Sequence, residues 1–303
     1  MPYIMMIIVV FIYSGNIIVG KAINDLYPFT ITFFRLLIAF AFLFPLGYRG
    51  AREARGTFMT YKRPFLIMAL TGIALFNTFL YGALQFTSAT NVSVLESAIP
   101  VVTLLLSAWL LKERLLPIQR FGIILSFIGS VTVIINGKFL QLAEIPWNVG
   151  DLIMFGAIIS WAIYSVYVKQ YMHLFPAFGA PLVMTAVSLI IVFPFLLIEW
   201  YIFGIPQLFS MNYVLGLLYL GIFPSFIALI LFNRAVDLLS ASEASVFLNF
   251  LPVVTIAAAY LWLGETITLM QLAGSALVII GVLFTNRVRA NDRTKVIRSE
   301  EIS

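Results

Sequence analysis

The chain has 303 residues, of which 62% are hydrophobic and only 10% are charged, and its formal net charge is +5. Soluble domains carry about 25% charged residues, so a soluble protein of this length could not cover its apolar surface with so few charges. The composition therefore excludes a soluble enzyme or binding domain and predicts an integral membrane protein. The absence of cysteine excludes disulfides and thiolate metal sites.

A bilayer core needs about 20 apolar residues per helix. In chain order, this rule predicts ten membrane spans, joined by short connections except at residues 49–63 and 137–149. The predicted spans cover residues 4–22, 29–48, 64–84, 92–111, 118–136, 150–170, 178–200, 213–234, 243–262 and 268–286. The fold class is therefore an all-α membrane protein with ten transmembrane helices, followed by a basic tail at residues 287–303.

Basic residues predict the orientation, because they concentrate in the cytoplasmic loops of membrane proteins. If the N-terminus lies inside, only Lys21, Arg35 and Lys138 of the 18 basic residues are left for the outer half. We therefore expect an N-in/C-in topology, with the tail in the cytoplasm. Since the basic residues lie in loops between apolar spans, we expect no nucleic-acid partner.

Residues 92–130 and 244–282 are two copies of one pattern. Both contain Pro-Val-Val-Thr, followed at identical spacing by a glutamate, a glutamine and two glycines. Glu113 has basic neighbours on both sides, whereas the equivalent Glu265 has none, as expected if the two face opposite sides of the membrane.

The repeat predicts how the chain is organised. Five spans per half is an odd number, so the two halves must insert in opposite directions. We therefore expect two inverted five-helix repeats, residues 1–137 and 150–286. This arrangement is typical of transporters in which one central site is exposed to either side in turn.

These features together resemble the drug/metabolite transporter superfamily, specifically its EamA-like branch. The resemblance is carried by the five-plus-five plan, by the small residues that begin the fourth and ninth spans, and by the Pro-Val that follows them. It is also carried by the glutamate after each of these spans and by the Gly-x6-Gly of the fifth and tenth. The residues concerned are Tyr13–Asn16, Phe34-Arg35, Ser88-Ala89 and Ser240-Ala241. The resemblance implies a transporter of small metabolites, often an amino-acid or drug exporter, and leaves the substrate open.

The chain contains no recognisable enzyme or metal site. Its one histidine, His173, is expected in a loop and has no cysteine or second histidine with which to share a metal. Neither a G-x-S-x-G elbow nor a glycine-rich phosphate loop is present. We expect no catalytic activity, no cofactor and no metal.

Glu96 is the most informative candidate for a site, because a carboxylate within a span is costly and generally faces a cavity or a partner. Pro100 cannot donate a backbone hydrogen bond and displaces the carbonyl four residues earlier, which is that of Glu96. Pro252 acts in the same way beside Asn249 in the second half. We interpret Glu96 as a site for a substrate ammonium group or for proton coupling; the alternative is a structural pair with Arg35.

Other polar residues within the predicted spans complete the set of candidate substrate-binding residues. Asn77 and Tyr81 lie four residues apart, as on one face of a helix. Aromatic and polar side chains together suit an organic substrate. The remaining candidates are Asn16, Trp161, Tyr164 and Asn233. For each, the alternative is an interhelical hydrogen bond or a lipid-facing position.

Two further expectations concern packing. Arg35 lies within a span, and an ion pair with Asp25 or Glu96 is favoured over a substrate contact. The spans 118–136 and 268–286 carry glycines and few polar groups, so we expect them to pack together outside the substrate cavity or to form a homodimer interface.

We expect a secondary transporter that exports a small organic metabolite, such as an amino acid or a drug-like compound, by alternating access. Proton coupling through Glu96 is one alternative, and an uncoupled facilitator or exchanger is the other. A membrane receptor or scaffold is the alternative outside transport. The expected partners are the small-molecule substrate and membrane lipid, and the expected location is the cell (inner) membrane, as a multi-pass protein.

Overall fold

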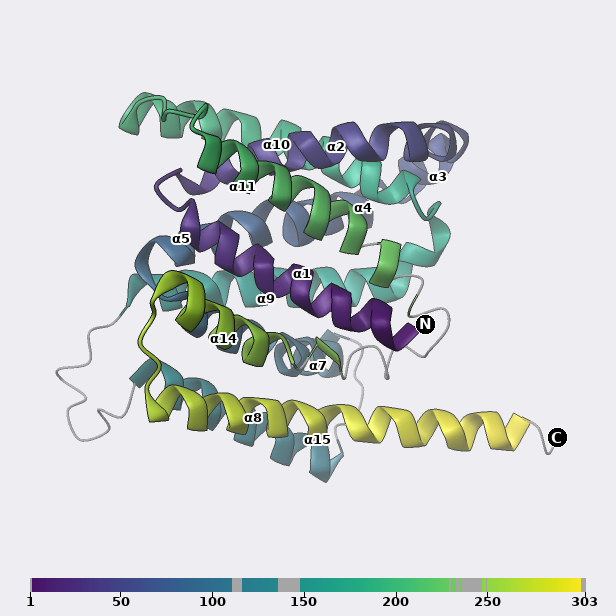
Figure 1. Ribbon diagram of the computed structural model, residues 1–303. Helices are drawn as coiled ribbons and strands as arrows, with labels where there is room; N and C mark the ends of the chain where they lie inside the picture. The colour runs from purple at the N-terminus through teal and green to yellow at the C-terminus, as the bar shows by residue number, and fades with distance from the viewer. Residues whose placement is uncertain are drawn as a thin grey trace.

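The computed structural model describes residues 2–300, apart from 111–115, 136–147, 229, 233–234, 236–246 and 249. Every regular element in the described ranges is a helix, as Figure 1 shows. The elements are α1 (Pro2–Ala22), α2 (Pro28–Glu53), α3 (Arg55–Thr60), α4 (Lys62–Met68), η1 (Ala69–Leu75), α5 (Phe76–Phe86), α6 (Ala89–Glu96), α7 (Ile99–Leu110), α8 (Pro117–Ile135), α9 (Val149–Tyr171), η3 (Met172–Leu174), α10 (Gly179–Phe203), α11 (Met211–Ile222), η4 (Phe223–Ile227), α14 (Leu251–Leu263) and α15 (Leu269–Glu300).

Seven helical stretches in the described part of the chain are long and apolar enough to cross a membrane. They are Pro2–Ala22, Pro28–Glu53, Lys62–Phe86, Ala89–Leu106, Val149–Leu174, Gly179–Phe203 and Met211–Phe232. Three shorter apolar helices, Pro117–Val133, Leu251–Leu263 and Leu269–Phe284, coincide with the other predicted spans. The all-helical membrane fold is therefore confirmed, whereas the number of ten spans and their orientation stay predictions.

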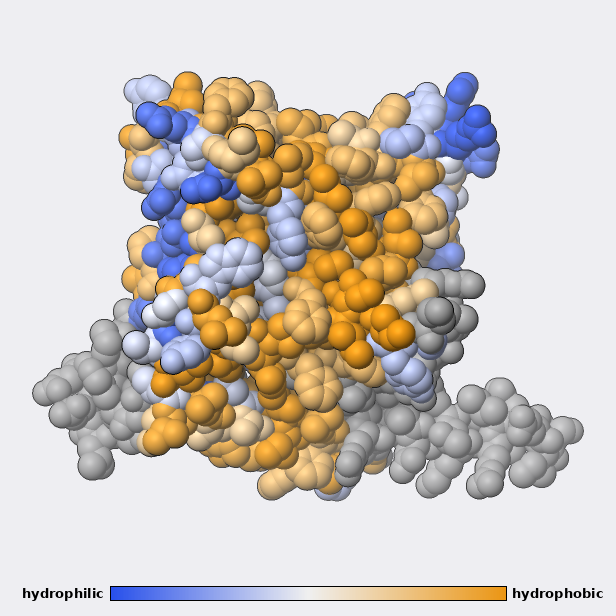
Figure 2. Space-filling view, viewed as in Figure 1, coloured by the Kyte–Doolittle hydropathy of each residue, from blue (hydrophilic) through white to orange (hydrophobic). Residues whose placement is uncertain are grey.

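Charged residues gather at the two ends of the bundle, and a broad hydrophobic surface separates them (Figure 2). We call the end where α2 begins and α10 finishes the acidic end, because Asp151, Glu199 and Glu265 lie there. We call the opposite end, where α2 finishes with Arg49 and Arg52, the basic end. An apolar belt between two charged margins is the surface that a bilayer requires.

Helices from the two predicted halves pack against each other throughout the bundle. α2 lies along α10, and α1 lies along α14. α5 packs on α9 in the interior, where fully buried side chains such as Leu80, Met154 and Ile158 form the main core. Each half therefore contributes to one continuous core.

α8 and α15 form a close pair at one edge of the bundle (Figure 1). A Cβ atom added to Gly129 would lie 2.7 Å from the carbonyl oxygen of Gly274, and one added to Gly281 would lie 2.6 Å from that of Gly122. Only glycine allows backbones to approach so closely. The predicted packing of spans 118–136 and 268–286 is confirmed, while homodimerisation stays a prediction.

Candidate substrate-binding site

Arg35 in α2 lies at the centre of a polar cluster inside the bundle and is only 5% exposed. Its Nη1 donates to the Oδ1 atoms of Asn77, at 2.6 Å, and Asn16, at 3.2 Å, and to the hydroxyl of Tyr81. Its Nη2 donates to the Oγ of Ser225 at 2.7 Å. We call these five residues the Arg35 cluster. They bring together α1, α2, α5 and η4, which belong to both predicted halves.

The spacing of Asn77 and Tyr81 explains why both reach Arg35. The two residues are one turn apart on α5, so their side chains share a face. Tyr81 is fully buried and its hydroxyl also donates to Asn16 Oδ1 at 3.0 Å. The guanidinium carbon lies 5.5 Å from the centre of the Tyr81 ring, within the range of a cation–π interaction.

Two π-helical segments adjoin this cluster. η1 leads directly into α5, just before Asn77, and η4 contains Ser225. The Asn77 Nδ2 donates to the carbonyl of Ile73 within η1, and the Ser225 hydroxyl donates to the carbonyl of Leu220. Such segments are rare and occur frequently at functional sites. The widened turns therefore position acceptors for Arg35 in corresponding helices of the two predicted halves.

The positive charge of Arg35 has no carboxylate partner among the described residues. Its four acceptors are neutral oxygen atoms, and its Nε is buried without any hydrogen-bond partner. Asp25, one expected partner, instead accepts a hydrogen bond from Tyr213 near the acidic end. The expected ion pair of Arg35 with Asp25 or Glu96 is therefore wrong for this structure. A buried charge compensated only by dipoles is costly.

Glu96 is the last residue of α6, and α7 begins at Ile99 after a turn at Ser97-Ala98. The helix is thus interrupted four residues before Pro100, at the position that the proline predicts. One oxygen of the Glu96 carboxylate, Oε2, is buried and has no hydrogen-bond partner in the structure.

Trp161 and Tyr164, both on α9, face the protein interior. The ring of Trp161 lies 4.5 Å from that of Phe76 and 5.0 Å from that of Tyr164. The lipid-facing alternative is therefore wrong for this pair. Aromatic side chains beside polar ones are typical of sites for organic molecules.

The other predicted site residues have different outcomes. Asn233 and Asn249 lie outside the described residues. Pro252 lies in the first turn of α14, where a proline is compatible with the helix. Ser225 and Tyr13 were not predicted as site residues. Only the Pro224-Ser225 pair, a helix-disturbing proline beside a hydroxyl within an apolar span, could have indicated Ser225.

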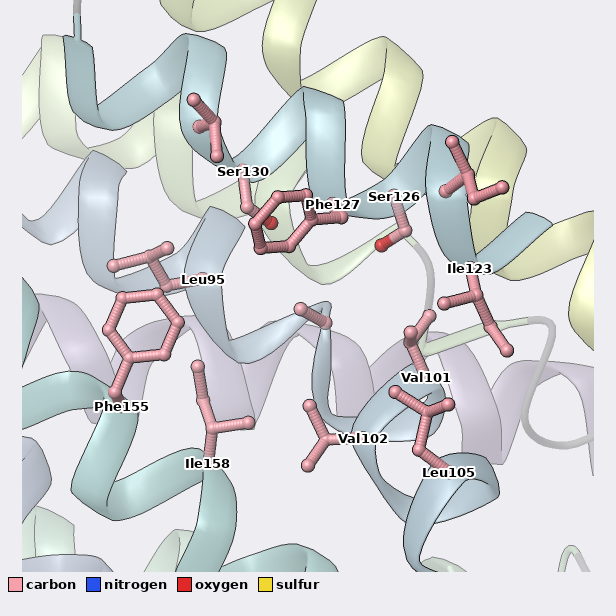
Figure 3. Close-up of a pocket in the computed structure, with 13 residues that line it drawn as sticks. Leu95, Val101, Val102, Leu105, Ile123, Ser126, Phe127, Ser130, Phe155 and Ile158 are labelled. Atoms are coloured by element: carbon pink, nitrogen blue, oxygen red, sulfur yellow. The ribbon is translucent and has the colours of Figure 1, made fainter. Parts of the chain in front are cut away.

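A separate cavity of about 240 Å³ lies among α6, α7, α8 and α9 (Figure 3). It is lined by apolar side chains such as Val102 and Phe155, together with Ser126 and Ser130. The hydroxyls of these two serines are buried without a hydrogen-bond partner in the described structure. No residue of the Arg35 cluster lines this cavity. Apart from these two hydroxyls, no lining side chain is polar, so the cavity offers no charged group to orient a polar metabolite.

Comparison with known proteins agrees with this architecture. The model of the EamA-like transporter family matches residues 1–135 and 148–287. An uncharacterized transporter of Archaeoglobus fulgidus is 27% identical, over 93% of this chain and 96% of its own. A probable amino-acid metabolite efflux pump of Salmonella typhimurium is 29% identical, over 71% of this chain and 74% of its own.

Among solved structures, one crystal structure superposes with a TM-score of 0.64 at 17% identity, covering 95% of this chain and 96% of that one. This likeness supports the fold alone. The family match and the names of the relatives indicate a small-molecule transporter rather than an enzyme, located in a membrane that in bacteria is the inner membrane. The chain belongs to the EamA-like transporter family.

Proposed function

We propose that this protein is a secondary transporter that exports a small organic metabolite of the amino-acid type by alternating access. The observation that carries this proposal is the Arg35 cluster, in which one buried cation is held by α1 and α5 of the first half and by η4 of the second. A relative movement of the halves would change the surroundings of Arg35. The name of the Salmonella relative supports the choice of substrate class.

The proposal includes ten transmembrane helices arranged as two inverted repeats, with both termini in the cytoplasm. The acidic end then faces outward and the basic end faces the cytoplasm. Two carboxylates of the second half, Glu199 and Glu265, hold the beginnings of α2 and α6 at the acidic end. In the proposed orientation these carboxylates join the two halves at the outer side, and the stacked rings of Phe58 and Phe175 join them at the cytoplasmic side.

Topology can be tested directly because the chain contains no natural cysteine. Single cysteines at positions 113 and 265 are labelled with a membrane-impermeant maleimide from one side at a time. We expect labelling of position 113 only from the cytoplasmic side and of position 265 only from the outside. Labelling of both from the same side contradicts the inverted repeat.

Transport itself is tested by counterflow. Purified protein is reconstituted into liposomes loaded with a mixture of amino acids, and the uptake of each labelled amino acid is measured. We expect uptake above that of protein-free liposomes for at least one amino acid. Ser126→Ala removes a buried hydroxyl in the apolar cavity, outside the Arg35 cluster. This control variant should transport at the native rate. A protein without counterflow for any substrate favours the receptor or scaffold alternative.

Proton coupling through Glu96 is the finer part of the proposal, and facilitated exchange without coupling is the alternative. Glu96 supports coupling because its unpaired, buried oxygen lies at the helix interruption. A carboxylate without compensation in apolar surroundings is costly unless it gains a proton or a cationic ligand.

A further inference from the structure

The donors of Arg35 are only partly used. A guanidinium group carries five N–H donors, and the three neutral acceptors of Asn16, Asn77 and Tyr81 all gather around Nη1. Nη2 carries two N–H groups but has one acceptor, Ser225, while the Nε–H has none. The donors left without partners therefore belong to Nε and Nη2.

Nε and Nη2 lie along one edge of the planar guanidinium, and their parallel N–H groups match the two oxygens of a carboxylate. The opposite side of the group is anchored to α1 and α5 through Nη1. This anchoring fixes the plane of the guanidinium, so the edge that carries the unpartnered Nε–H has a defined orientation. A preorganised fork of this kind favours a planar, two-oxygen anion over a spherical one.

The charge balance of the cluster points to the same ligand. The positive charge of Arg35 meets no acidic side chain within ion-pair distance in the described ranges, although such a charge is costly when buried. A ligand with a single negative charge would compensate it. A phosphate ester carries more charge and is usually held by several cations, yet no second lysine or arginine among the described residues donates to the cluster.

We propose that the Nε–Nη2 edge of Arg35 is the carboxylate subsite of this transporter, and that its substrates are monocarboxylates. This rests on the proposed transport function and narrows its substrate class. Nε is buried in the present conformation, so the carboxylate reaches it when the two halves move apart. The aromatic group of Phe76, Trp161 and Tyr164 then receives the apolar part of the substrate.

The test compares acids with their amides, which have the same shape but no negative charge. Binding to the purified protein is measured by isothermal titration for L-phenylalanine and L-phenylalaninamide, L-leucine and L-leucinamide, and 3-phenylpropionate and its amide. We expect at least one acid to bind, with a matched amide at least about tenfold weaker, because a charge-assisted bidentate pair is lost. Equal binding of acids and amides, or no binding of any acid, overturns the proposal.

Variants of Arg35 test whether the preference for acids over amides depends on the Nε–Nη2 edge of the guanidinium. Arg35→Met should bind acid and amide equally weakly, and Arg35→Lys should retain part of the preference for acids because it keeps the charge but not the fork. Ser126→Ala is the control and should behave as the native protein does. A folded Arg35→Met protein that binds the acids with unchanged Kd overturns the assignment.

The unliganded melting temperature shows whether Arg35→Met is folded. We expect a cooperative transition at a lower temperature than in the native protein, because the variant removes a costly buried charge but leaves the buried acceptors of the Arg35 cluster without their donor. Should this variant fail to fold, the acid–amide comparison in the native protein and in Arg35→Lys decides. Counterflow of phenethylamine, which has no carboxylate, separates the two proposals: a protein that moves this amine and ignores the acids is a transporter without the carboxylate subsite.

Discussion

Buried charges at the acidic end of the bundle are fully satisfied, whereas those at its centre are not. The Glu199 carboxylate, 4% exposed, accepts hydrogen bonds from the backbone N–H groups of Phe29 and Thr30 and from the Thr30 hydroxyl, all within 2.9 Å. Glu265 likewise accepts from two backbone N–H groups, those of Ala89 and Thr90, and from the Thr90 hydroxyl. A carboxylate at a helix N-terminus is well placed, because unpaired N–H groups and the helix dipole both favour it.

The central charges lack such partners. Arg35 is surrounded by neutral oxygens, and Glu96 has an oxygen with no hydrogen-bond donor. Fully satisfied charges join helices and hold the fold, whereas unsatisfied ones retain capacity for a ligand or a proton. The comparison therefore supports a structural role for the acidic end and agrees with the proposed role of the centre in transport.

The largest effect is expected at Glu96. Glu96→Gln should leave the protein folded but abolish transport driven by a pH gradient, because the amide cannot carry the proton. Exchange between substrate pools should persist, since it needs no net proton movement. Uptake into reconstituted vesicles with and without an imposed pH gradient measures this. Gradient-driven transport at the native rate in this variant would remove Glu96 from the coupling role and favour the facilitator.

Glu199→Ala should have the largest effect on stability. It leaves three donors at the start of α2 without an acceptor in a buried position, so the free energy of unfolding should fall by about 3 kcal/mol. Glu199→Gln, which retains one carbonyl acceptor, should lose about half as much. Thermal unfolding in detergent measures the change in the free energy of unfolding. The ratio of the affinities for acid and amide should stay at its native value. If Glu199→Ala changed the preference for acids over amides while the protein kept its native stability, the structural role of the acidic end would be contradicted.

Glu265→Ala should have a smaller effect of the same kind. The carboxylate is only half-buried, so water can replace part of its contacts with α6, and the expected loss is about 1 kcal/mol. The same unfolding measurement applies. If Glu265→Ala lowered the free energy of unfolding as much as Glu199→Ala does, the difference in solvent exposure between the two glutamates would not affect their contribution to stability.

The smallest effect is expected in the apolar cavity. The Ser126 hydroxyl has no partner in the structure, so Ser126→Ala removes no hydrogen bond and should change the free energy of unfolding by less than about 0.5 kcal/mol. Transport should be unchanged. A marked loss of transport here would show that the cavity, rather than the Arg35 cluster, contributes to the substrate path.

The sequence predicted those features that depend on local chemistry. The interruption at Glu96 follows from the missing N–H of Pro100, and the α8–α15 contact follows from glycine spacing. Asn77 and Tyr81 were predicted together because a four-residue spacing defines a helix face. Each of these inferences needs only a short stretch of chain.

Features that depend on distant partners were missed or wrong. Glu199 binds Thr30 across 169 residues, and nothing in either segment indicates the other. Ser225 reaches Arg35 through a π-helical turn, whose wider hydrogen-bond ring has no clear sequence signature. The expected ion pair of Arg35 failed because opposite charges in neighbouring spans do not determine how side chains are directed.

The π-helical segment η1 also has a consequence for how relatives of this chain diverge. A π turn accommodates an extra residue within a helix that is otherwise α-helical. Deleting one residue from Ala69–Leu75 would rotate α5 by about 100° relative to α4, because an α-helix has 3.6 residues per turn. Asn77 and Tyr81 would then turn away from Arg35 together. A single insertion or deletion would therefore remove both contributions of α5 to the Arg35 cluster in one evolutionary step, while changing the amino-acid composition of the helix by only one residue.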